Sequence, residues 1–288
     1  MKFENYIDQV WTDHANHPQK VADGFGDAAS LVETSEHLTQ LTAIVTHVMG
    51  EHLGKWTEGQ VLLESLQEHK AFIAGTEADM AIRRSIAVMK LGRNELQNLL
   101  TFGRSDQVRI LAVTSSALGE REPDRGKELL LKALDLARQG LEKEDPANRA
   151  LAVSGNNLAC ALEEKESRAP AENELLILAA KTGREFWEIA GGWLEVSRAE
   201  YRLGMSYLAT GNMTKALQHA QTCVEMCREN KAGDLDMFFA LEVLAKVEKA
   251  RQNHLGFNAA LDQATRHFEK LSPEDREWCE PYLKKIRV

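Results

Sequence analysis

Hydrophobic residues between positions 197 and 230 recur at helical spacing and fall into two runs. The two runs carry their apolar residues one or two helical turns apart: Leu203 and Tyr207 in the first, Leu217 and Val224 in the second. Gly211-Asn212 separates the runs, and such a pair is typical of a turn. The pattern predicts two antiparallel helices whose apolar faces meet.

This segment resembles a tetratricopeptide repeat. Leu203-Gly204 is followed three residues later by Tyr207, and the second helix carries Ala216 and Ala220 at positions for close packing. It departs from the family pattern at Glu200, where a Trp is typical, at Ala220, where an aromatic residue is typical, and in lacking a closing Pro. The resemblance implies a right-handed superhelix, or α-solenoid, of tetratricopeptide-like hairpins that holds a protein or peptide partner in its concave groove.

Similar pairs of amphipathic segments fill most of the remaining chain. They are 3–14 with 18–29, 35–52 with 57–69, 77–91 with a short helix to about 102, 106–118 with 124–139, 147–165 with 170–187, and 234–252 with 256–270. Ser272-Pro273-Glu274-Asp275 is a helix-opening signal, so residues 272–288 are expected to form a C-terminal capping helix. A single hairpin cannot bury its apolar face alone. The sequence therefore predicts an all-α fold, a single repeat domain over residues 1–288, with the loop 119–124 as the weakest boundary.

The composition limits the classes of partner that we expect more than it limits the possible folds. The chain is 43% hydrophobic and 27% charged, with a net charge of −9, which argues against nucleic-acid or anionic-membrane partners. Its start lacks the pattern of a secretion signal, and its apolar runs are too short for a bilayer, so a cytoplasmic protein is expected. Four scattered cysteines favour reduced thiols over a disulfide framework: Cys160, Cys223, Cys227 and Cys279.

Motifs for enzymatic chemistry are missing from the sequence. It contains no phosphate-binding loop, nucleophile elbow or dinucleotide fingerprint, so neither enzymatic activity nor a cofactor is predicted. Two carboxylate-rich runs, 142–145 and 163–166, are expected to be solvated faces or turns.

Histidines are concentrated in the N-terminal third, where His47 and His52 frame a stretch that superficially resembles a zinc-protease helix. Residues five apart on an α-helix are separated by about 140°, so the two side chains are expected to point to different sides. No metal site is predicted; an enzyme with a metal here would need His37, His47 or His52 to converge. His219, Cys223 and Cys227 share one helical stripe, and packing is the expected role of the cysteines.

The concave groove implied by the resemblance can be placed on the sequence. First helices of successive hairpins would present these residues to it: Arg109, Arg149, Asn156, Arg198, Tyr201, Lys246 and Lys249. The five cations among them, here called the basic ladder, predict an acidic partner segment or a C-terminal carboxylate. The competing interpretation is an ordinary solvated surface, with an apolar or convex binding site elsewhere.

An adaptor or scaffold that binds a protein segment is thus the first functional hypothesis. The alternative is a regulatory sensor domain that binds a small molecule or short peptide, which would need a closed aromatic pocket around Trp187, Trp193 and Tyr201. The fold alone does not decide between these two functions.

Overall fold

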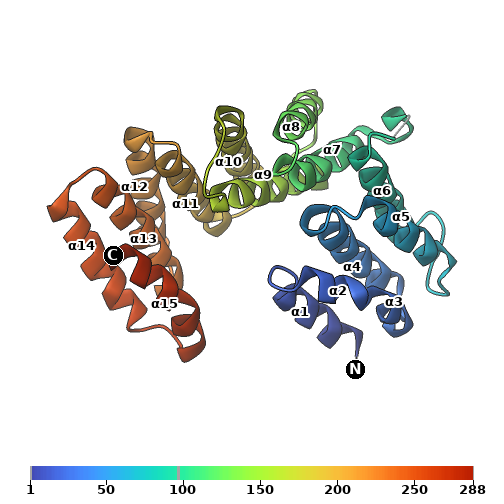
Figure 1. Ribbon diagram of the computed structural model, residues 1–288, viewed down its shortest axis with the longest axis horizontal. Helices are drawn as coiled ribbons and strands as arrows, with labels where there is room; N and C mark the ends of the chain where they lie inside the picture. Colours follow the sequence, from blue (N-terminus) through green and yellow to red (C-terminus); the bar gives the residue numbers. More distant parts are fainter. Residues whose placement is uncertain (1, 96–97, 288) are drawn as a thin grey trace. The chain divides into compact units, whose positions relative to one another are not determined.

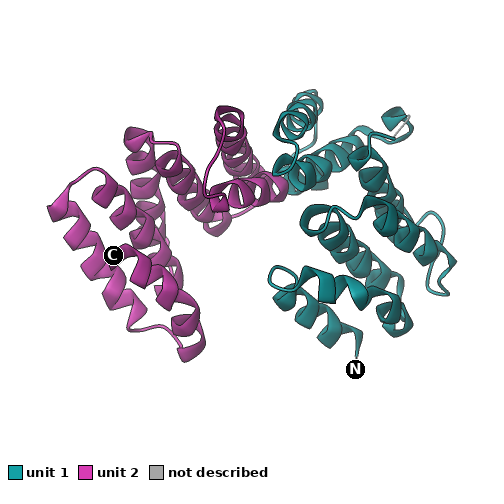
Figure 2. Cartoon of the chain, in the orientation of Figure 1, with its two compact units in different colours: residues 1–151 teal, residues 152–288 magenta. Residues whose placement is uncertain are grey.

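The computed structural model describes residues 2–95 and 98–287, and the regular elements in those ranges are all helical (Figure 1). The chain divides into two compact units, residues 1–151 and 152–288 (Figure 2). The division falls within α9 (Pro146–Glu164), a continuous helix, and not at the loop 119–124. None of the described helices is both long and apolar enough to cross a membrane.

Unit 1 contains the helices that precede α9. They are α1 (Phe3–Asp13), α2 (Pro18–Asp23), α3 (Phe25–Ala28), η1 (Ala29–Leu31), α4 (Ser35–Thr46), η2 (His47–His52), α5 (Trp56–Ser65), η3 (Leu66–Glu68), α6 (Glu77–Gly92), η4 (Leu99–Thr101), α7 (Arg104–Gly119) and α8 (Pro123–Arg138). α4 and α5 both pack on α6, and α7 pairs with α8. Phe25, Leu38 and Ile82 are among the fully buried core residues. Helices occupy the predicted segments, and the pairing of α7 with α8 is confirmed. The pairing predicted for 35–52 with 57–69 differs, because α4 and α5 each pack mainly on α6. Of the short helix expected up to about residue 102, η4 is the helical part among the described residues, and Leu96 and Gln97 lie outside them.

Unit 2 contains the rest of α9 and six further helices. They are α10 (Pro170–Ala190), α11 (Trp193–Ala209), α12 (Met213–Glu229), α13 (Asp234–Ala250), α14 (His254–Phe268) and α15 (Pro273–Arg287). α11 pairs with α12 and α13 with α14, and α11 also packs on α13. α15 packs on α13 and α14, as expected of a closing helix. The first helices of successive hairpins therefore touch, which is the arrangement that a stacked repeat requires.

Local sequence signals explain where many of these helices begin. Pro18, Pro123 and Pro170 occupy the first turn of α2, α8 and α10, where the missing N–H costs nothing. The side chain of Asn212 caps α12 by accepting a hydrogen bond from the Lys215 amide at 3.2 Å. These signals act within one turn, so they can be read before the tertiary structure is known.

One carboxylate-rich run departs from the prediction. Glu164 and Glu166 are exposed, but Glu163 is not a solvated residue. Its side chain is buried, forms an ion pair with Arg202 and accepts a hydrogen bond from Ser206 Oγ at 2.5 Å. The expectation failed because Arg202 and Ser206 come from α11, a helix about 40 residues further along the chain.

Candidate functional site

Arg109, the first member of the basic ladder, lies on α7 in a cluster of charges within unit 1. Its guanidinium is 3.7 Å from Asp106 Oδ1 and 3.8 Å from Glu77 Oε1. The buried Arg84 forms ion pairs with the same two carboxylates. Burial lowers the pKa of Arg109, and the charge of Arg84 adds to the shift. Arg109 therefore belongs to an internal network of alternating charges.

The ladder residues of unit 2 also have partners inside the chain. Arg198 Nη2 lies 2.9 Å from Asp236 Oδ1, Lys246 forms an ion pair with Glu242, and Lys249 Nζ donates to the Ile286 carbonyl at 3.2 Å. Much of the positive charge predicted for the groove is thus compensated by acids and carbonyls within the same unit.

Of the three remaining groove residues, Tyr201 lies on α11 and the other two lie on α9. Arg149 is exposed and belongs to unit 1, whereas Asn156 is partly buried and belongs to unit 2. Asn156 Nδ2 lies 3.8 Å from Cys160 Sγ, one turn further along the helix. The predicted role of Asn156 in holding a partner backbone stays a prediction.

Four aromatic side chains meet on the face of unit 2 formed by α11, α13 and α15. These four, named here the aromatic cluster, are Tyr201, Phe239, Trp278 and Tyr282. Phe239 is at the centre, with ring centroids 6.0 Å from Tyr201, 5.2 Å from Trp278 and 5.3 Å from Tyr282. These separations are typical of favourable aromatic pairs. Trp278 remains 53% exposed, so the cluster reaches the surface.

From this cluster, sequence reasoning assigned only Tyr201 to a binding surface and left open whether Phe239 is core or exposed. Trp278 and Tyr282 lie one turn apart on α15, but a closing helix gives no reason to expect a binding surface. Phe238 and Phe239 are adjacent in sequence and take different roles: Phe238 is fully buried, and Phe239 is only partly covered. The spacing of Trp278 and Tyr282 was therefore the available signal.

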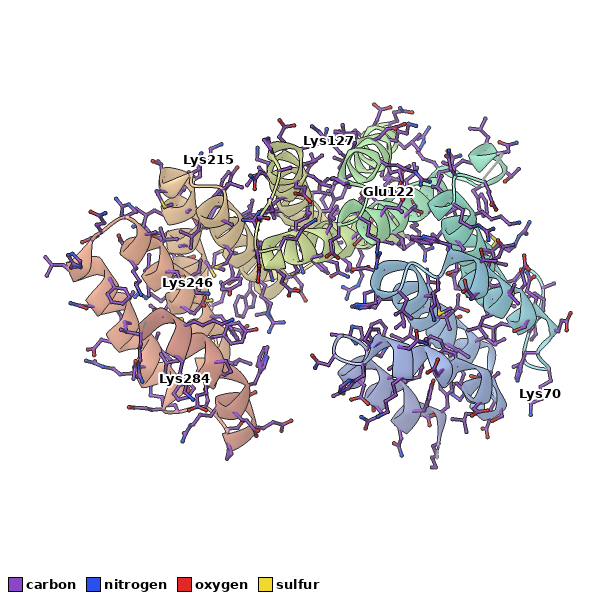
Figure 3. All side chains as sticks on the ribbon, in the orientation of Figure 1. Lys70, Glu122, Lys127, Lys215, Lys246 and Lys284 are labelled. Carbon is purple, nitrogen blue, oxygen red and sulfur yellow. The ribbon has the colours of Figure 1, made fainter. Side chains whose placement is uncertain are left out.

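A buried charge lies beside the aromatic cluster. Glu242 is 0% exposed and forms an ion pair with Lys246, which projects from α13 in Figure 3. Among the described residues, neither Glu242 oxygen has a well-directed hydrogen bond, so Lys246 is its main compensating group. Burial raises the pKa of Glu242, and it raises the pKa of Tyr201 well above its usual value. Arg202 lies over the Tyr201 ring at 5.7 Å and completes this polar layer.

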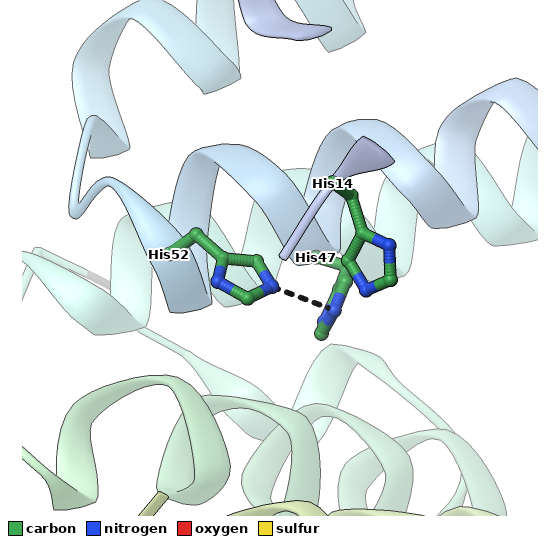
Figure 4. Close-up of side chains that lie close together, drawn as sticks. All are labelled: His14, His47 and His52. Atoms are coloured by element: carbon green, nitrogen blue, oxygen red, sulfur yellow. Dashed lines mark hydrogen bonds between the residues drawn. The ribbon is translucent and has the colours of Figure 1, made fainter. Parts of the chain in front are cut away.

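A second cluster, in unit 1, corrects the prediction that His47 and His52 point to different sides. Residues 47–52 form a π-helix, in which the Leu53 amide donates to the Val48 carbonyl at 3.0 Å. A π-helix spaces its hydrogen bonds five residues apart, so residues five apart share a side. The two Nε2 atoms lie 3.1 Å apart (Figure 4).

His14, at the end of α1, completes this histidine cluster. Its ring centroid lies 5.0 Å from that of His47 and 5.2 Å from that of His52. Burial lowers the pKa of His52 to about 4, with the neighbouring His47 adding to the shift, and burial also lowers the pKa of His14. His37 lies apart from this cluster, because its ring stacks on Phe3 at 4.2 Å.

The stripe of His219, Cys223 and Cys227 behaves as expected of packing residues. Both cysteines are buried, and their sulfurs lie 3.6 Å and 3.2 Å from Ser197 Oγ. His219 Nδ1 instead lies 2.6 Å from Glu200 Oε2. The packing role of the cysteines is confirmed.

Comparison with known proteins gives similarity at the level of the fold. No family model and no curated protein matches this sequence. Among solved structures, the chain is similar to the crystal structure of BtubC (BKLC) from P. vanneervenii, with 15% sequence identity and a TM-score of 0.50. The similarity covers 95% of this chain and 94% of that one. At this identity it concerns the fold alone.

Proposed function

We propose that this chain is a partner-binding adaptor of the tetratricopeptide-like class, holding a peptide segment of another protein on the face formed by α11, α13 and α15. The observation that carries the proposal is the aromatic cluster, in which a half-exposed Trp278 rests on Phe239. Trp and Tyr dominate the binding energy of many protein interfaces. A continuous aromatic surface of this kind is suited to a bulky apolar side chain of the partner.

The repeat architecture supports the same class of protein. α11, α12 and α13 are each 17 residues long, so a hairpin with its turn is slightly longer than the tetratricopeptide repeat of about 34 residues. In such arrays the first helices of the hairpins line the concave face, and α11 and α13 are first helices here. A right-handed superhelix is part of the proposal.

Acidic residues of the partner are expected to contribute less to affinity than its apolar residues, because the cations on this face are already paired. Lys246 and Arg198 are paired with Glu242 and Asp236, so an acidic ligand would have to compete with these internal partners. We expect the apolar anchor to supply most of the affinity, while acidic residues or a C-terminal carboxylate near Lys249 raise the association rate.

Selection from a library of random linear peptides tests this proposal. The library is displayed on phage and selected on the immobilised full chain, and the enriched peptides are then synthesised and titrated by fluorescence anisotropy. We expect peptides with a bulky apolar residue. We expect Trp278→Ala to weaken their binding by at least about tenfold, because truncating a hot-spot residue costs about 2 kcal/mol or more and about 1.4 kcal/mol already corresponds to tenfold.

Leu255→Ala is the matched control, because Leu255 on α14 is 85% exposed and lies outside the aromatic cluster. It should leave peptide affinity unchanged. Equal binding of the selected peptides to wild type, Trp278→Ala and Tyr282→Ala, with all three equally helical by circular dichroism, would show that this face is not the binding site.

A further inference from the structure

The histidine cluster brings three nitrogen ligands to one point in unit 1. One ring nitrogen from each of His14, His47 and His52 lies within 4.8 Å of the others. In a tetrahedral zinc site with Zn–N bonds of about 2.0–2.1 Å, the ligand nitrogens are about 3.3 Å apart. The His47–His52 pair, at 3.1 Å, already has nearly this separation, and the nitrogen of His14, within 4.8 Å of both, would have to move closer to complete the triangle.

The second nitrogen of two of these rings is already engaged. His14 Nδ1 lies 2.6 Å from the Trp11 carbonyl, and His47 Nδ1 lies 3.1 Å from Glu51 Oε2. An N–H at Nδ1 that donates to these oxygens leaves the lone pair on Nε2, which faces the centre of the cluster. Metal-binding histidines in proteins are oriented by carbonyl and carboxylate partners of this kind.

The π-helix that carries His47 and His52 is anchored by hydrogen bonds from a residue outside it. The guanidinium of Arg121, in the turn after α7, donates to the Glu51 carbonyl at 2.9 Å and to the His52 carbonyl at 2.8 Å. These bonds secure the end of the π-helix and so position the His52 ring. A site whose ligands are fixed before binding loses less entropy when it binds.

We infer that His14, His47 and His52 bind one divalent transition-metal ion, with Zn²⁺ as the preferred ion. Three imidazoles favour zinc, copper, nickel or cobalt over magnesium and calcium, which prefer oxygen ligands. Zinc suits a tetrahedral set in which three protein ligands leave one position for water. The ion would link the end of α1 to the π-helix.

Calorimetric titration of the chelator-treated full chain with ZnCl₂ tests the inference. We expect one equivalent to bind, and we expect His14→Gln, His47→Gln and His52→Gln each to weaken binding by about 100-fold or more. Glu51→Gln, which alters only the partner of His47, should weaken it about tenfold. His37→Gln is the control, because His37 is in the same third of the chain and outside the cluster, and it should bind as wild type does.

A spectroscopic measurement on the chain with all three histidines intact tests the inference even if a histidine variant fails to fold. Bound Co²⁺ should give the intense visible absorption of a tetrahedral site and should quench Trp11, whose ring lies 5.7 Å from that of His47. Trp11→Phe should remove that quenching. Zinc at 100 times its dissociation constant should also reduce the unfolding equilibrium constant about 100-fold.

Three results would overturn the inference. They are the absence of stoichiometric Zn²⁺ binding by wild type, a loss in His37→Gln as large as in the cluster variants, and a Co²⁺ complex with neither tetrahedral absorption nor quenching of Trp11.

Discussion

Replacing Gly155 with alanine should lower the free energy of unfolding by about 2 kcal/mol. A Cβ atom at this position of α9 would lie 2.7 Å from the Ala179 carbonyl oxygen and 2.7 Å from the Gly183 amide nitrogen. Both atoms belong to the backbone of α10, so no side chain can rotate away and the two helices must separate. Overpacking of this kind typically costs about 1–3 kcal/mol and occasionally more, and the better helix propensity of alanine recovers at most about 1 kcal/mol.

Urea unfolding followed by far-ultraviolet circular dichroism measures this effect. Gly233→Ala is the control, because a Cβ there meets no atom within 4 Å and its φ of −64° is ordinary for any residue. Gly233 is the N-cap of α13, where glycine is favoured over alanine, so the control should lose less than about 1 kcal/mol. A Gly155→Ala chain that unfolds at the wild-type urea concentration would show that α9 and α10 do not approach so closely.

The Lys246→Met substitution should destabilise the chain by about 3 kcal/mol at neutral pH. It removes the cation that forms the ion pair with Glu242 and leaves this fully buried carboxylate with only Tyr201 and the charge of Arg202 to compensate it. Removing one member of a buried ion pair is far more costly than replacing both members with apolar residues. Glu242→Leu combined with Lys246→Met should therefore recover most of the loss.

The destabilisation caused by Lys246→Met should become smaller as the pH falls. The folded-state pKa of Glu242 is raised by burial, so between the unfolded and folded pKa values the folded chain keeps a proton that the unfolded chain has lost. Stability from this group is present at low pH and is lost as the pH rises through that range. Without Lys246, which lowers the pKa of Glu242, the folded-state pKa of this carboxyl group rises further. An equal loss at neutral pH and at about pH 5 would contradict this account.

The helices could be predicted from sequence because their limits depend on local signals. Pro170 and Asn212 begin helices through contacts within one turn, and Gly211 ends one with a φ of +79°. The division of the chain within α9 has no comparable signal, because no turn residue marks it.

The candidate binding face could be predicted only in part. The register placed Tyr201 and Lys246 on first helices, as the structure has them. The other rings of the aromatic cluster come from elsewhere than the helix of Tyr201: Phe239 lies on the next hairpin and Trp278 on the closing helix. Which rings meet depends on how α15 packs, and no pattern within a single helix contains that information.

The histidine cluster was missed for a different reason, since the wrong helical period was assumed. The π-helix is stabilised by tertiary packing around Gly50, where a Cβ would lie only 3.0 Å from the Trp56 ring. The same ring lies against Gly92, at the end of α6. A helix that must fit this aromatic side chain between two glycines cannot be recognised from its own residues.

The π-helix also makes the meeting of His47 and His52 depend on the local helical period and not on their spacing alone. In a regular α-helix the same two side chains, five residues apart, would diverge by about 140°, whereas loss of one residue between them would leave them four apart and again on one face. A deletion that removes the widened turn would therefore keep the pair together, while a change that straightens the turn without shortening it would separate the two histidines. Histidine pairs five residues apart are for this reason worth testing for a widened turn before they are dismissed as unrelated.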